Sequence, residues 1–347
     1  MTISLADTLA GIILVALTAY VLLGGADFGG GVWDLLASGP RRARQRDVVA
    51  RAIGPVWEAN HVWLILAVVL LFTCFPPAFA RIAIALHVPL TLLLIGIVLR
   101  GSAFAFRSYA GEREAEVRWG RVFAVASLVT PVLLGVAVGS VASGAVGDWA
   151  KWNGRGFYEA YVATWLTPFA FAVGLFALAC FAFLAAVYLT LEARDRELQE
   201  DFRLRAIGAG VAVFVTAALG LLLSPQAPVV GRGLVASPWA VTLHVVTGGA
   251  AVTAFWALWA RRYRVARVAA ATQVALILWG WGLAQYPYLL PPDLTIAAAA
   301  APRVTLELAL GAVSLGAIVL FPSLYYLLRV FKTPSSAPPT TPPRPPR

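Results

Sequence analysis

Two acids and one arginine lie within or beside long apolar segments, where a charged group is usually paired with an opposite charge or has a functional role. Asp27 lies in a glycine-rich segment, GGADFGGG. Glu58 begins the next apolar segment, and Arg100 comes late in the third. Ionisable residues in membrane segments pair with one another or mark ion pathways, because an unpaired buried charge is costly. Two roles therefore stay open, an ion pair between Arg100 and one acid, and a proton path through the acids.

The three histidines are further candidates for chemistry, because imidazole can relay protons near neutral pH and can bind haem iron. His61 follows Glu58 by three residues, so both lie on one helical face. His61 either relays protons with Glu58 or hydrogen-bonds a neighbour. His87 and His244 are isolated, and Met1 is the only methionine. Haem iron takes His, Met, Cys or Tyr ligands, so this scattered set predicts no haem on this chain alone.

The composition requires lipid as the solvent. Of 347 residues, 60% are hydrophobic and 13% charged, against about a quarter charged in a soluble domain. The apolar runs are continuous and do not alternate, which favours helices over a barrel. We therefore expect an all-α integral membrane protein with about nine transmembrane helices. The runs cover residues 8–30, 57–76, 82–106, 121–145, 162–191, 206–224, 238–259, 266–286 and 304–328.

Several features constrain the partners and the turns. The net charge is +10, but the basic residues lie in short loops, without a stripe interleaved with aromatics, which excludes a nucleic-acid role. Cys74 and Cys180 lie in separate apolar runs, and we expect buried thiols without a disulfide or a metal. Pro76, Pro77 and Arg81 predict a tight turn between the second and third helices.

The distribution of basic residues predicts the orientation. The first, third, fifth and seventh loops and the tail hold 21 of the Lys and Arg residues, and the other loops hold five. The positive-inside rule then places the C-terminus in the cytoplasm and the N-terminus outside. We expect residues 1–332 to form the membrane domain. The proline-rich residues 333–347 are expected to be a disordered cytoplasmic tail.

The segment IGPVWEANHVWLI, residues 53–65, together with the preceding GGADFGGG, resembles the signature of subunit II of cytochrome bd-type quinol oxidases, in the cyanide-insensitive-oxidase-like branch. The similarity extends from the first helix to the ninth. It continues through FTCFPPAF at 72–79, Arg100, Phe106-Arg107, Gly135, Gly139, Thr167-Pro168-Phe169 and QYPYLLPP at 285–292.

This resemblance implies a respiratory enzyme of the bacterial inner membrane that oxidises quinol and reduces oxygen to water. It implies proton uptake from the cytoplasm without proton pumping. Haem b and haem d would be carried by subunit I, with which this chain would form a heterodimer in contact with quinone and membrane lipid. A small accessory subunit is a further partner to expect.

The resemblance also implies residue roles. Glu58 matches the acid of the family's proton path, and Asp27 matches the aspartate of its glycine-rich turn. Some members have Glu where this chain has His61. Trp57, Asn60 and Trp63 match the motif, and we expect them to pack and hydrogen-bond at the partner-facing end. The alternatives are a secondary transporter, which often has broken helices and midplane charges, and a purely structural subunit.

Overall fold

A computed structural model describes residues 4–53, 57–109, 113–147 and 156–332. Eight helices in this part are long and apolar enough to cross a membrane, and a bent helix pair makes up to nine spans. The prediction of an all-α membrane protein with about nine spans is confirmed. The eight are α1 (Leu5–Leu35), α5 (His87–Tyr109), α6 (Arg113–Ser143), α8 (Pro168–Glu192), α9 (Arg196–Leu222), α11 (Ala240–Trp259), α12 (Tyr263–Gln285) and α14 (Arg303–Lys332).

The ninth span is the bent pair α3 (Trp57–Cys74) and α4 (Pro76–Ala85), whose axes differ by 116°. The chain does turn sharply where Pro76 and Pro77 predict it, and the two prolines are also the first residues of α4. Proline is favoured there because the first turn has no intrahelical use for its missing N–H. The third apolar run is therefore divided between α4 and α5 at Leu86.

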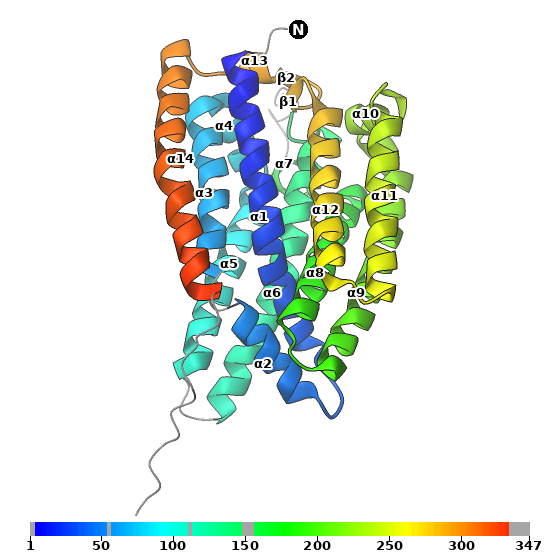
Figure 1. Cartoon of the computed structure of the whole chain (residues 1–347). Helices are drawn as coiled ribbons and strands as arrows, with labels where there is room; N and C mark the ends of the chain where they lie inside the picture. The colour runs from blue at the N-terminus through cyan, green and yellow to red at the C-terminus, as the bar shows by residue number, and fades with distance from the viewer. Residues whose placement is uncertain (1–3, 54–56, 110–112, 148–155, 333–347) are drawn as a thin grey trace, which may run out of the picture.

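Short elements close the two ends of the bundle. One end, here called the hairpin end, carries α10 (Pro228–Ala236), α13 (Ile296–Ala299) and the antiparallel strands β1 (Tyr288–Leu290) and β2 (Leu294–Thr295) (Figure 1). The other, here called the arginine-rich end, carries α2 (Arg42–Ile53) and the α8–α9 and α11–α12 turns. The short helices α7 (Phe157–Tyr161) and η2 (Ser224–Gln226) complete the described elements.

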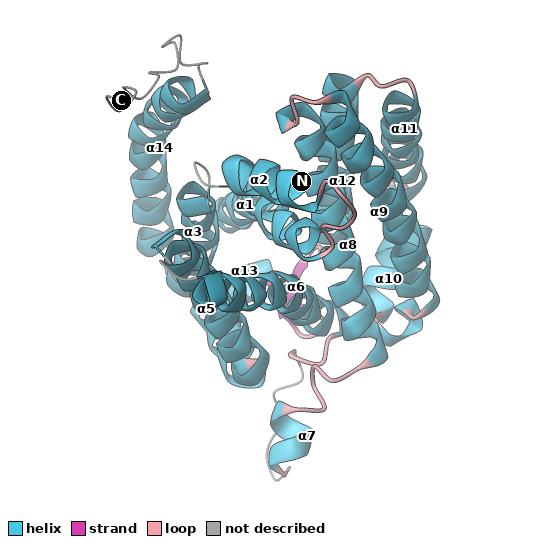
Figure 2. Cartoon of the chain, turned by 90° about the horizontal axis from the view of Figure 1, so that it is seen from below, coloured by secondary structure: helices cyan, strands magenta, loops and turns pink. Residues whose placement is uncertain are grey.

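The spans form two groups, seen from the arginine-rich end in Figure 2. One contains α1, α3, α5 and α6, and the other contains α8, α9, α11 and α12. The groups are joined where α8 packs against both α1 and α6. Helix α14 lies at the margin against α1 and α3, and most of its apolar surface faces outward.

Glycine allows the two groups to approach at backbone distance. A Cβ on Gly29 of α1 would lie 2.0 Å from the carbonyl oxygen of Phe181 in α8. A Cβ on Gly135 of α6 would lie 2.6 Å from the Cα of Gly174. Both contacts exclude any larger residue. Cys180 lies beside this seam, and both it and Cys74 are buried, as expected.

Candidate functional site

Asp27 of α1 and Arg100 of α5 form a two-pronged ion pair, here called the buried pair. Arg100 Nη1 donates to Oδ2 of Asp27 at 2.9 Å, and Nη2 donates to Oδ1 at 2.6 Å. Nη2 also donates to the Asp27 carbonyl oxygen at 3.1 Å. Both side chains are only 3% exposed. This geometry is the strongest form of a carboxylate–guanidinium contact, and it occupies both oxygens of the acid.

The rest of the guanidinium is also satisfied by its neighbours. Arg100 Nε donates to the Ser127 hydroxyl at 3.1 Å, and that hydroxyl donates to the Phe123 carbonyl oxygen at 2.7 Å. The Arg100 Cζ lies 4.6 Å from the Phe28 ring centre and 5.0 Å from that of Phe123. Aromatic faces attract a cation that has lost its water. The buried pair is therefore complete in its hydrogen bonds and sealed by rings.

The glycine-rich segment around Asp27 explains how three elements reach the pair. Gly29 admits the α8 backbone, as described above. A Cβ on Gly31 would lie 2.1 Å from the Ser127 hydroxyl of α6, and one on Gly30 would lie 2.7 Å from Ile53 of α2. Successive glycines face different neighbours because helical residues are 100° apart. The segment thus brings α2, α6 and α8 close to one turn of α1.

A second ion pair, Asp34 with Arg107, lies one heptad further along both helices and is here called the end pair. Arg107 Nη1 donates to the two Asp34 oxygens at 3.3 and 3.2 Å. The Asp34 side chain is 3% exposed and Arg107 23% exposed. Arg46 Nε lies 3.8 Å from Asp34 and donates to its carbonyl oxygen. This pair was not predicted from the sequence.

The spacing of these residues in the sequence would have revealed the end pair. Asp27 and Asp34 are seven residues apart, as are Arg100 and Arg107, and both pairs have the same separation of 73 residues. Seven residues are close to two helical turns, so each set lies on one face. Because α1 and α5 both run from the hairpin end to the arginine-rich end (Figure 1), matching positions meet twice.

The arginine-rich end also carries a polar network. Asp201 of α9 accepts hydrogen bonds from Arg41 at 2.8 and 2.7 Å and from Gln45 at 2.8 Å. Gln45 accepts from Arg205 at 2.7 Å. The hydrogen bond donated to Asp201 raises the pKa of Arg41 above its ordinary value. This network fastens α2 to α9.

The predicted motif residues of α3 lie near the buried pair, and the structure describes some of them. His61 lies between α1 rings, with centroids 6.2 Å from Tyr20 and 6.4 Å from Phe28. Asn60 is fully buried and Trp63 is 9% exposed. Within the described residues, the amide of Asn60 and the indole N–H of Trp63 have no hydrogen-bond partner.

Two further motif residues, Trp57 and Glu58, begin α3, but the placement of their side chains lies outside the described part of the structure. The structure brings Asp27 and Arg100 together, as the ion-pair role requires. The position of the Glu58 carboxyl group relative to them stays a prediction.

The histidines do not form a set that fits haem. His87 donates from Nδ1 to the Ile84 carbonyl oxygen at 3.0 Å, and its ring lies 4.8 Å from that of Tyr161. His244 on α11 donates from Nδ1 to Ala240 at 2.6 Å. The ring of His61 is surrounded by α1 aromatics instead. Among the described residues, no three His, Cys, Asp or Glu side chains gather as a metal site would need.

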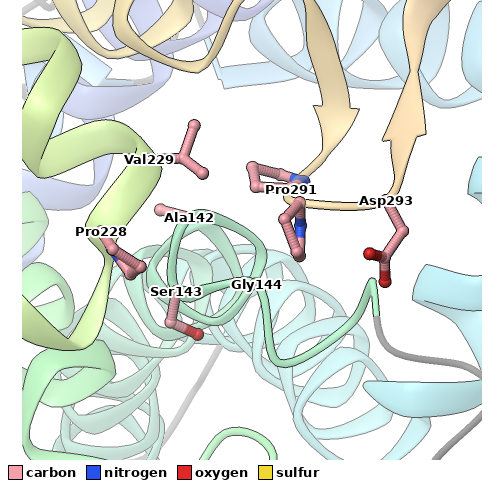
Figure 3. A pocket seen from close by; sticks show the side chains of 8 residues that line it. Ala142, Ser143, Gly144, Pro228, Val229, Pro291 and Asp293 are labelled. Atoms are coloured by element: carbon pink, nitrogen blue, oxygen red, sulfur yellow. The ribbon is translucent and has the colours of Figure 1, made fainter.

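A small pocket of about 310 Å³ lies at the hairpin end. Figure 3 shows its walls, which come from Ser143 and Gly144 at the end of α6, Pro228 of α10, and Pro291 and Asp293 in the strand turn. Among the described wall residues, Asp293 alone is charged. The pocket is remote from the buried pair, which lies in the half of α1 nearer the arginine-rich end (Figure 1).

The fold and the buried charges define a multi-span membrane protein with ionisable groups held between helices. A family model described as cytochrome bd terminal oxidase subunit II matches residues 5–331. The chain therefore belongs to this family and is a subunit of a respiratory quinol oxidase, an oxidoreductase complex of the membrane.

Relatives and a solved structure agree with this membership. The "Putative cytochrome bd menaquinol oxidase subunit II" of Bacillus subtilis (strain 168) is 22% identical over 90% of this chain and 91% of its own length. The "Cytochrome bd-I ubiquinol oxidase subunit 2" of Escherichia coli (strain K12) is 27% identical over 51% and 46%. A chain of the bd oxidase from Geobacillus thermodenitrificans has the same fold, with a TM-score of 0.78, 24% identity, and coverage of 94% and 98%.

Proposed function

We propose that this chain stabilises the haem-bearing subunit I of a bacterial inner-membrane bd oxidase and carries protons from the cytoplasm toward the site of oxygen reduction to water. Glu58 is the proton-carrying acid in this proposal. His61 is a relay candidate, and Asp27 and Arg100 are its electrostatic neighbours. The arginine-rich end is the cytoplasmic side, in line with the positive-inside rule, so the N-terminus is outside and the C-terminus inside.

The buried pair supports this division of roles between the acids. Both oxygens of Asp27 accept hydrogen bonds from Arg100, and the pair is shut off from solvent. With both oxygens held by guanidinium donors and the side chain buried, this carboxylate is poorly placed to exchange protons with a neighbouring group. Of the two acids singled out from the sequence, Glu58 is then the one left for proton transfer.

The haem proposal follows from the ligands that this chain offers. The described histidines lie on three helices, α3, α5 and α11, each against different neighbours, so they do not offer a two-histidine ligand set for a haem. We therefore assign haem b and haem d to subunit I, the partner of this chain in a heterodimer. Quinol is the electron donor of that complex, and membrane lipid and a small accessory subunit are its other partners. The work of this chain is done by its own side chains, which position and move protons.

Glu58→Gln in the intact complex tests the proton role. We expect oxygen consumption to fall by roughly 100-fold, the low end of what a positioned proton-transfer group contributes. Glu58→Asp is the matched control, because it keeps a carboxylic acid at this position and should retain much of the rate. Haem content measured from the reduced-minus-oxidised spectrum shows that each variant complex is assembled.

Unchanged turnover in an assembled Glu58→Gln complex would leave only the purely structural role for this chain. The reading as a secondary transporter is set aside by family membership over residues 5–331. A purified lone chain that bound haem stoichiometrically would overturn the assignment of the haems to subunit I.

A further inference from the structure

Some arginines of the arginine-rich end are paired with acids of the same chain. Arg41, just before α2, lies 2.7 Å from Asp201, Arg44 of α2 pairs with Asp195, and Arg203 of α9 pairs with Glu200. These arginines serve to fasten one helix to another or to hold one helical turn. Their charge is largely compensated within the chain.

The α11–α12 turn is different. Arg261, Arg262, Arg264 and Arg267 lie within seven consecutive residues. In the described part of the chain, only Arg261 has a carboxylate partner, Glu200 at 3.4 Å, and that acid is already shared with Arg203. Three positive charges of this turn thus have no acid partner among the residues that the structure describes.

Two of these three arginines are held in place by aromatic rings. The Cζ of Arg262 lies 5.3 Å from the ring centre of Trp256, and the Cζ of Arg267 lies 4.8 Å from that of Tyr188. A cation–π contact fixes a guanidinium without removing its charge or occupying all of its donors. These side chains are therefore oriented but keep N–H groups free for an anion.

Apolar surface lies directly beside these charges. Trp259, at the end of α11, is 76% exposed, and Val268, one residue after Arg267, is 67% exposed. Tryptophan at the end of a membrane helix is typical of the interface between headgroups and acyl chains. The turn thus offers unpaired cations next to an apolar surface, which suits an amphipathic anion better than a free ion.

We propose that the α11–α12 turn binds an anionic phospholipid, with Arg262, Arg264 and Arg267 contacting its phosphate and Trp259 and Val268 contacting its acyl chains. Clusters of basic residues at the cytoplasmic ends of membrane helices bind acidic headgroups, at about 1 kcal/mol for each residue. This site is separate from the buried pair and does not depend on the proton role of Glu58.

The test uses the complete oxidase complex, delipidated in a neutral detergent and titrated with phosphatidylglycerol or phosphatidylcholine. Native mass spectrometry counts the bound lipids, and the thermal midpoint reports the stabilisation by ligand. Phosphatidylglycerol should bind and raise the midpoint, whereas phosphatidylcholine should do so weakly. Replacing Arg262, Arg264 and Arg267 by Gln should weaken phosphatidylglycerol binding roughly 100-fold, and each single replacement about fivefold.

The control removes three charges elsewhere at the same end, by replacing Arg42, Arg118 and Arg121 by Gln. These arginines are exposed on α2 and α6. Retained phosphatidylglycerol binding in this control supports the site. Equal loss in both triple variants would reduce the effect to general attraction by surface charge and overturn the proposal. Equal stabilisation by inorganic phosphate alone would also overturn it, because a site for a free anion needs no acyl chain.

Discussion

The buried pair and the end pair use the same two residue types at the same separation, yet their surroundings differ. In the buried pair both side chains are 3% exposed, whereas in the end pair Arg107 is 23% exposed and Arg46, at 31%, shares the acid. The first acid has one partner and no access to water. The second has two partners, and both arginines reach solvent. The same two residue types are therefore expected to contribute different free energies of stabilisation at the two positions.

The largest effect is expected from Arg100→Leu. This change leaves the Asp27 carboxylate buried without a partner, and breaking such a pair costs about 3–5 kcal/mol. We expect little intact complex, measured as assembled haem protein per mass of membrane and as the thermal midpoint of what remains. A variant as stable as the wild type would show that water reaches Asp27, and would remove the contrast between the two pairs.

A smaller effect is expected from Arg107→Leu in the end pair. Asp34 keeps Arg46 nearby, and solvent at this end can screen the remaining charge, so we expect a loss of about 1–2 kcal/mol. The loss should shrink as salt is raised, since interactions open to solvent are screened. Thermal midpoints at low and high salt measure this. A loss as large as that of Arg100→Leu would mean that both pairs are equally sealed.

The smallest effect is expected when both members of the buried pair are replaced, as Asp27→Leu with Arg100→Leu. Apolar residues of similar volume in place of a buried ion pair are often neutral or stabilising, so the double variant should recover most of the stability lost by Arg100→Leu alone. Its oxygen-consumption rate is the sharper measurement. Near-normal turnover would assign Asp27 a structural role, and assembled but inactive complex would place it in the proton path.

Much of the fold was predictable, because the physics of lipid leaves long apolar runs few structures to adopt. The ends of the helices were less predictable. The run predicted at 206–224 belongs to α9, which begins at Arg196, because Arg203 and Arg205 are satisfied by Glu200 and Gln45 and so extend the helix beyond its apolar part. Gln45 lies 160 residues from Arg205 in sequence, and a hydropathy profile detects neither this partner nor the local pair of Arg203 with Glu200.

The residues of the candidate site could be predicted from the sequence, but which of them pair with each other could not. From the sequence, either Asp27 or Glu58 could pair with Arg100. The parallel course of α1 and α5 brings Asp27 to Arg100. Asp34 was overlooked because it follows the apolar run and looks like a loop residue. The strands β1 and β2 were also not predicted, since a hairpin of three and two residues with prolines has no alternating pattern to detect.

The separation of 73 residues between each acid and its arginine also has a consequence in time. During synthesis at about 5–20 residues per second, Asp27 is made roughly 4–15 seconds before Arg100. Throughout that interval Asp27 and Asp34 are present on α1 without either of their α5 partners. An unpaired acid is costly in lipid, so we expect this half of α1 to stay in the aqueous insertion channel during the interval. The arrival of α5 then supplies the arginine partner of each acid and fixes α1 in the membrane.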